Sequence, residues 1–122
     1  MVGLPIYGGA HPMFVQGLIS LTAQPPCKVS YRFNTWNSLV SVARNQLAAD
    51  FLESDCTHLL FIDSDIGFKA EHVAQLLARD CDLIGGLYPY KKPGPPEYVS
   101  NALSESPPET DGLQELKYVA VQ

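Results

Sequence analysis

The apolar segment from Thr57 to Ile62 ends abruptly in two carboxylates, Asp63 and Asp65, with Ser64 between them. Packing gives no reason for a buried strand to end in this way. Two carboxylates suit Mg²⁺ or Mn²⁺, because these cations bind few protein oxygens and complete their coordination with water and ligand phosphates. The alternative is structural, since Asp-Ser-Asp is also good turn chemistry ahead of a helix. The motif therefore predicts either a cation-and-phosphate site or a simple turn.

Two further groups of side chains could take part in phosphate or nucleotide chemistry. Arg44 is predicted on the polar flank of a helix, where its guanidinium could reach a phosphate or a base edge. The aromatic and basic stretch that contains Tyr88, Tyr90, Lys91 and Lys92 could stack on a sugar or base and screen a diphosphate. The structural alternatives are a solvated helix face for Arg44 and an exposed loop for the second group.

The histidines and cysteines form no recognisable catalytic or metal-binding set. His11 and His72 are expected at a helix start and on an exposed helix face, and His58 inside a strand. The three cysteines are odd in number, lie far apart and match no common zinc spacing. Reduced, partly buried thiols in a cytoplasmic protein are the simplest interpretation.

Length and charge narrow the class of protein. A chain of 122 residues corresponds to one domain, and 46% hydrophobic residues is ordinary for a soluble fold. The formal net charge of -5 argues against a general nucleic-acid binder. No apolar run is long enough to span a bilayer, and the first residues lack the pattern of a signal peptide. We therefore expect a cytoplasmic protein without a membrane span.

Short β-type runs alternate with helical patterns along the first ninety residues, which predicts an α/β fold with a mostly parallel sheet. Helices are expected from Pro12, from Asn34 or Thr35, and near Ala70. The second of these should bury an apolar stripe made of Trp36, Leu39, Val40, Ala43, Leu47 and Phe51. The expected strands are Val2 to Tyr7, Lys28 to Phe33, His58 to Ile62, and Leu83 to Leu87.

Parallel sheets bind ligands outside the carboxyl ends of their strands. The aspartate pair lies at such an end, as do Tyr7-Gly8-Gly9 and the segment around Tyr88. Residues 1–90 are therefore predicted to form a ligand-binding α/β domain. Residues 91–122 are expected to add a Pro-rich loop or lid and a terminal apolar strand to the same domain. That last strand could be completed by a second subunit, giving a homodimer.

The order of these features resembles the nucleotide-binding half of a GT-A-fold, family-2-like glycosyltransferase. The resemblance depends on four segments: the first strand ending in Pro5-Ile6-Tyr7-Gly8, Ala43-Arg44-Asn45 in a helix, the DxD motif in HLLFIDSDIGF, and DLIGGLYPYKK after it. It covers residues 2–92. It implies a Rossmann-like sheet flanked by helices, a nucleotide-sugar donor, Mn²⁺ or Mg²⁺, and transfer of the sugar to an acceptor.

The resemblance also implies a role for each matching residue. Pro5, Tyr7 and Gly8 would line the nucleobase pocket, and Arg44 would lie near the nucleotide. The Asp63-Ser64-Asp65 segment would hold the donor, with Asp63 near the ribose or a metal-bound water. Asp65 would bind the metal that stabilises the departing diphosphate, which makes it the expected catalytic residue. Tyr88, Tyr90 and Lys91 would lie near the donor sugar or cover it.

The chain departs from this family after Gly112, where the acceptor-binding half and its catalytic base would be expected. A truncated, weakly active or inactive nucleotide-binding module, or an assembly partner, is therefore the main alternative to an active transferase. A phosphatase with an aspartate nucleophile fits less well, because Ile66-Gly67 follows the motif and the motif lies on the third strand. A sugar nucleotidyltransferase would need basic residues near Gly8-Gly9.

Overall fold

The computed structural model describes residues 1–86 and 88, and it contains three strands and three helices in this part of the chain. The strands are β1 (Val2–Ile6), β2 (Tyr31–Thr35) and β3 (Leu60–Phe61), and the helices are α1 (Pro12–Ala23), α2 (Val40–Leu52) and α3 (Ala70–Leu77). All six belong to one compact unit, Met1–Arg79, while Asp80 begins a second unit. The alternation of strands and helices confirms the predicted α/β class.

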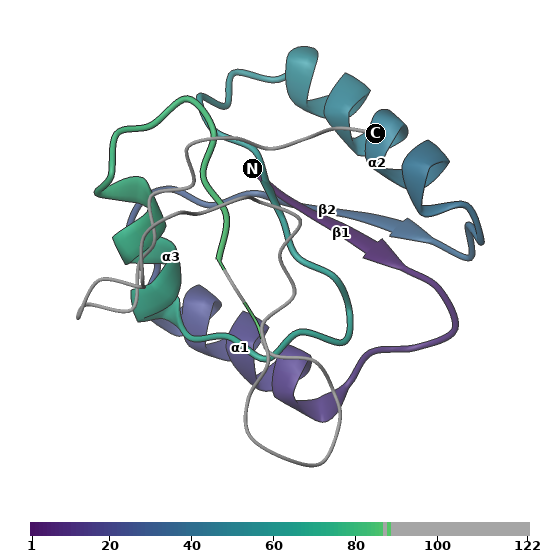
Figure 1. Ribbon diagram of the computed structural model, residues 1–122, viewed down its shortest axis with the longest axis horizontal. Coiled ribbons are helices and arrows are strands. Elements are labelled where there is room, and N and C mark those ends of the chain that lie inside the picture. Colours follow the sequence, from purple (N-terminus) through teal and green to yellow (C-terminus); the bar gives the residue numbers. More distant parts are fainter. Residues whose placement is uncertain (87, 89–122) are drawn as a thin grey trace, which may run out of the picture. The chain divides into compact units, whose positions relative to one another are not determined.

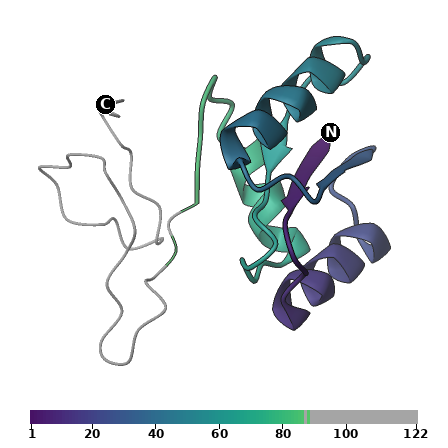
Figure 2. The ribbon, with the colours of Figure 1, turned by 90° about the vertical axis from the view of Figure 1, so that its right-hand side faces the viewer.

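The sheet has the strand order β2-β1-β3, and both neighbours run parallel to β1. Val2 pairs with Tyr31 on one side and with Leu60 on the other, so β1 is the central strand. Helix α2 covers one face of the sheet, and α1 and α3 cover the other (Figures 1 and 2). The carboxyl ends of the three strands therefore meet at one edge, with helices above and below.

The larger apolar core lies between the sheet and helices α1 and α3. Leu4 and Leu21 are fully buried there, and Phe14 is 1% exposed. The ring of Phe14 meets that of Phe68 edge to face, with 6.3 Å between centroids. Gly17 on α1 leaves room for the Phe68 ring, because a Cβ at this position would lie 2.6 Å from that ring. Phe68 thus ties α1 to the segment that leads from β3 into α3.

A smaller core lies on the α2 side of the sheet, where Ala43 and Leu47 are buried. A Cβ on Gly3 would come within 3.5 Å of Leu47 and 3.2 Å of the Phe61 ring. Gly3 therefore allows both side chains to approach the central strand closely.

Pro5 explains why the pairing of β1 with β3 is short. Leu60 donates its N–H to Met1, and Ile62 donates to Gly3, so the odd-numbered residues of β1 face β3. The next odd residue is Pro5, which has no N–H to donate. The chain can therefore leave the sheet directly after Ile62, at the two aspartates.

Several expected elements agree with the structure. The first strand, the helix from Pro12 and the helix near Ala70 lie where the sequence predicts them. The second strand begins at Tyr31, three residues later than expected, and the third is limited to Leu60–Phe61.

The predicted start and buried face of the second helix are wrong in part. The helix begins at Val40, not near Thr35, because Trp36 has a φ of 63° and Asn37 accepts a hydrogen bond from the Leu39 N–H in a turn. Trp36, Leu39 and Val40 are consequently exposed, while Ala43 and Leu47 are buried as predicted.

The predicted strand at Leu83 to Leu87 is wrong over its first four residues, since Leu83 to Gly86 contain no strand. Gly85 and Gly86 explain the failure, because glycine weakens a strand interior. Residue 87, the loop at 91–112 and the apolar segment that was expected to form a dimer lie outside the described residues. None of the helices in the described part is long and apolar enough to cross a membrane.

Candidate functional site

Asp63, Ser64 and Asp65 form a tight turn at the carboxyl end of β3. The Ile66 N–H donates to the Asp63 carbonyl at 3.1 Å, which places Ser64 and Asp65 at the tip of the turn. Asp65 is exposed, whereas Asp63 and Ser64 are half-buried. The turn that was predicted as the structural alternative to a cation site is therefore present. Asp65 is the more exposed of its two aspartates, and Asp63 is half-buried.

Arg44 holds the carboxylate of Asp63. Its Nη2 donates to Oδ1 at 2.8 Å and to Oδ2 at 3.0 Å, and the two side chains are 42% and 36% exposed. An ion pair with this exposure contributes at most about 1 kcal/mol to stability. The pair therefore matters more for the orientation of Asp63 than for the fold. Both bonds come from one nitrogen, so the N–H groups on Nη1 can serve another acceptor.

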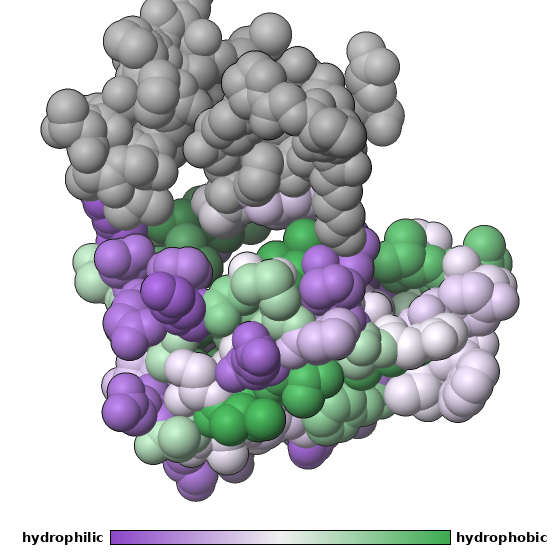
Figure 3. Space-filling view, turned by 90° about the horizontal axis from the view of Figure 1, so that it is seen from below, coloured by the Kyte–Doolittle hydropathy of each residue, from purple (hydrophilic) through white to green (hydrophobic). Residues whose placement is uncertain are grey.

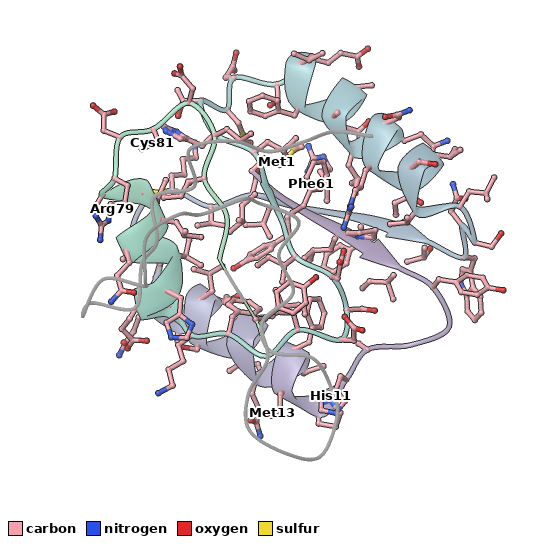
Figure 4. All side chains as sticks on the ribbon, viewed as in Figure 1. Met1, His11, Met13, Phe61, Arg79 and Cys81 are labelled. Atoms are coloured by element: carbon pink, nitrogen blue, oxygen red, sulfur yellow. The ribbon has the colours of Figure 1, made fainter. Side chains whose placement is uncertain are left out.

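The loop after β1 is attached to the same turn. The His11 N–H donates to the Ser64 carbonyl at 2.8 Å, and the His11 Nδ1 accepts from the Met13 N–H as the N-cap of α1. Figure 4 shows His11 and Met13 together at the start of this helix. The predicted residues Tyr7 and Gly8 lie in this loop, with Tyr7 64% exposed and Gly8 at a φ of 77°. The structure thus brings the first and third strand ends together.

Trp36 is a candidate site residue that the sequence did not indicate, because it was predicted to be in the core. It follows β2 directly, its N–H donates to the Ile6 carbonyl at 3.0 Å, and 80% of the side chain is exposed. A positive φ is a strained conformation for a large residue. The only sequence signal was the neighbouring Asn34 and Asn37, which favour a turn over a helix.

The two aspartates differ as metal ligands. Asp65 is exposed at the tip of the turn, whereas both oxygens of Asp63 accept bonds from a guanidinium. No group of three or more His, Cys, Asp or Glu side chains within residues 1–86 and 88 could hold a metal ion. The donor set fits Mg²⁺ or Mn²⁺ only where water and ligand oxygens complete the coordination. Asp65 is the better placed of the two to contact such a cation.

The predicted residues of the downstream segment lie outside the unit Met1–Arg79 that carries the aspartate turn. Tyr88 belongs to the second unit and is 39% exposed. Tyr90, Lys91 and Lys92 lie outside the described residues. Their contact with a donor stays a prediction.

A groove of about 450 Å³ lies between the beginning of α1 and the beginning of α3. It is lined by residues such as Met13, Gln16 and Lys69, and by none of the predicted site residues. Figure 3 shows the face that carries α1, where apolar and polar side chains are interspersed. The lining of the groove also includes Glu71 and His72, and it does not contain the Arg44–Asp63 ion pair.

Cys56 lies before β3, at the opposite edge of the sheet from the aspartates. A hydrogen bond with the Ser30 hydroxyl, and after it one with Ser54, lower the pKa of the Cys56 thiol to about 7. We expect alkylation of Cys56 by iodoacetamide to reach half its maximal rate near pH 7 when the other two cysteines are replaced by serine. Ser30→Ala should move this midpoint upward, and an unchanged midpoint would contradict the assigned cause.

Comparison of the chain with protein-family models, with curated proteins and with solved structures gave no match. The interpretation of the site therefore depends on its residues and their geometry.

Proposed function

We propose that the protein binds a nucleotide-sugar donor with a divalent cation and transfers the sugar, in the manner of a GT-A-fold glycosyltransferase. The observation that carries the proposal is the ion pair between Arg44 of α2 and Asp63, whose carboxylate lies in the same turn as the exposed Asp65. The turn is at the carboxyl edge of a parallel sheet, where α/β proteins bind their ligands. The Arg44 cation, its partner carboxylate Asp63 and the exposed carboxylate of Asp65 at one strand end are suited to a diphosphate and its metal.

The two aspartates have different roles in this proposal. Asp65 would hold Mn²⁺ or Mg²⁺, and the cation would supply positive charge that stabilises the departing diphosphate. Asp63 remains with Arg44 and accepts from a ribose hydroxyl or a water. Arg44 offers its Nη1 N–H groups to a phosphate oxygen, since Nη2 already serves Asp63.

The nucleobase occupies the other half of the edge. Tyr7 follows β1 and Trp36 follows β2, and both rings are largely exposed. Neighbouring strands lie about 4.8 Å apart, so β2 and β3, which flank β1, run about 10 Å apart across the sheet. This separation is comparable to the reach from a base to its diphosphate. The exposed aromatic side chains thus provide a stacking surface at a suitable distance from the carboxylates.

Calorimetric titration of the full chain with a panel of nucleoside diphosphates, with Mn²⁺ and with EDTA, tests the donor-binding part. We expect saturable binding of at least one diphosphate that is lost in EDTA. Transfer is tested separately by mass spectrometry after incubation with the corresponding nucleotide-sugars. Metal-dependent binding without any release of diphosphate would leave a binding module in place of a transferase, and absence of binding would refute the proposal.

Trp36 offers a prediction in which stability and binding move in opposite directions. Trp36→Asn replaces a residue whose backbone is strained at a φ of 63° with one that tolerates a positive φ, so we expect the free energy of unfolding to rise by about 1 kcal/mol. Loss of the ring on which the base stacks should weaken nucleotide binding by about 1–3 kcal/mol, which is roughly 5- to 150-fold in Kd. Urea denaturation and calorimetry measure the two effects.

The control is Leu39→Asn. Leu39 is also apolar and 62% exposed, but it has no aromatic ring on which a base could stack. This substitution should change the affinity for the nucleotide little. Equal affinity of Trp36→Asn and the wild type would contradict the stacking role.

A further inference from the structure

Phe61 lies directly beneath the Arg44–Asp63 ion pair. The guanidinium carbon of Arg44 is 5.9 Å from the centre of the Phe61 ring, within the range of a cation–π contact. Figure 4 shows Phe61 on the α2 side of the sheet. The same guanidinium donates to both oxygens of Asp63. The Phe61 ring thus supports the Arg44 guanidinium, which in turn orients the Asp63 carboxylate.

The orientation of the guanidinium depends on few contacts. Its Nε, which would share a carboxylate in a two-nitrogen fork, is buried and has no hydrogen-bond partner among the described residues. The bonds to Asp63 use Nη2 alone, which leaves the plane free to rotate about them. The face of the Phe61 ring, 5.9 Å from the guanidinium carbon, is placed to limit this rotation. Loss of the ring would leave the charges paired but less well ordered.

Gly3 determines where the Phe61 ring can lie. Gly3 and Phe61 are partners in the β1–β3 register, so their side chains point to the same face. A Cβ on Gly3 would be 3.2 Å from two atoms of the ring, which is tighter than an ordinary contact. The absence of a side chain at Gly3 therefore lets the ring lie across the central strand, below Arg44.

We propose that Phe61, resting on Gly3, is a positioning residue that orients Arg44 and through it Asp63 for the donor. This inference rests on the proposed function for its role in binding, although the order of the guanidinium can be measured without any ligand. The chain of contacts runs from the central strand to the site: Gly3, Phe61, Arg44 and Asp63.

The test compares Phe61→Leu with Phe61→Tyr. Leucine keeps an apolar side chain but removes the ring face, and tyrosine keeps the face. In the ligand-free protein, NMR should show the Arg44 side-chain protons shifted by the ring and its Nη protons resolved by slow rotation. We expect Phe61→Leu to lose both signatures, Phe61→Tyr to retain them, and Gly3→Ala to reduce the ring-induced shift. Ile62→Val, which alters the core on the other face, is the control for a general loss of packing.

The second readout is the affinity for a nucleoside diphosphate with Mn²⁺. Phe61→Leu should weaken it about two- to fivefold, and Phe61→Tyr should restore it. In an Arg44→Gln background, which leaves no cation over the ring, the Phe61→Leu effect should disappear. Wild-type Arg44 signatures in Phe61→Leu would overturn the positioning role. Ring-dependent signatures in a protein that binds no nucleotide would uphold the positioning role and refute the donor-binding function.

Discussion

Asp65→Asn should abolish the metal-dependent binding of a nucleoside diphosphate. Asparagine preserves the size of the side chain and is equally suited to the turn, so the fold should be unchanged. The substitution removes one unit charge from the exposed tip of the turn. A charge in contact with a cation is worth several kcal/mol even at the effective dielectric constant of a protein surface. We therefore expect the affinity to fall at least about 100-fold in calorimetry with Mn²⁺.

Asp55→Asn is the matched control, because Asp55 is an exposed aspartate that precedes β3 and so lies at the opposite edge of the sheet. It changes the net charge by the same amount and should leave the affinity within about twofold. Equal losses in the two variants would indicate a general charge effect and contradict the assignment of Asp65.

Phe14→Ala should give the largest loss of stability of any substitution considered for this protein. Phe14 is 1% exposed in the core between the sheet and helices α1 and α3, and its ring meets Phe68 edge to face. Truncation of a buried phenylalanine costs about 3–5 kcal/mol, since it removes apolar contacts and leaves a cavity. A domain of this size has a total stability of about 5–15 kcal/mol. Equilibrium unfolding in urea should therefore show a large shift of the midpoint.

Val15→Ala on the same helix is the control for Phe14→Ala. Val15 is 41% exposed, and its truncation should change the free energy of unfolding by no more than about 0.5 kcal/mol. A loss below about 1 kcal/mol for Phe14→Ala would mean that α1 does not form the principal core with the sheet. Phe14→Ala should weaken nucleotide binding only as far as it lowers the fraction of folded protein, because Phe14 lies on the opposite face of the sheet from Arg44.

Local sequence patterns predicted the elements whose signals are strong. The first strand, with its apolar run and glycine ending, and the helix that opens with Pro12 were located correctly. The helix around Arg44 was predicted to begin too early, because Trp36, Leu39 and Val40 continue the apolar stripe of the helix backward. Trp36, with its positive φ, donates its N–H to the Ile6 carbonyl of the neighbouring strand β1. Periodicity along one segment cannot show such a contact.

The residues of the proposed site could be named from the sequence, but the contacts between them could not. The types and order of Arg44, Asp63 and Asp65 pointed to cation and phosphate chemistry. The contact between Arg44 and Asp63 joins residues nineteen positions apart and depends on how α2 packs on the sheet. The support of Arg44 by Phe61, and of Phe61 by Gly3, depends on strand register. Such contacts follow from tertiary packing, which a single sequence does not specify.

Paramagnetic broadening of amide signals by Mn²⁺ tests the location of the donor site most directly. We predict that substoichiometric Mn²⁺, added to the protein with a bound nucleoside diphosphate, broadens the amide signals of Ser64, Asp65 and Ile66. The amide signal of His11 should broaden with them, because its N–H donates to the Ser64 carbonyl. The signals of Ser54 to Cys56, at the other edge of the sheet, should stay sharp. Saturable nucleotide binding with sharp signals throughout the Asp63 to Ile66 turn would contradict the account.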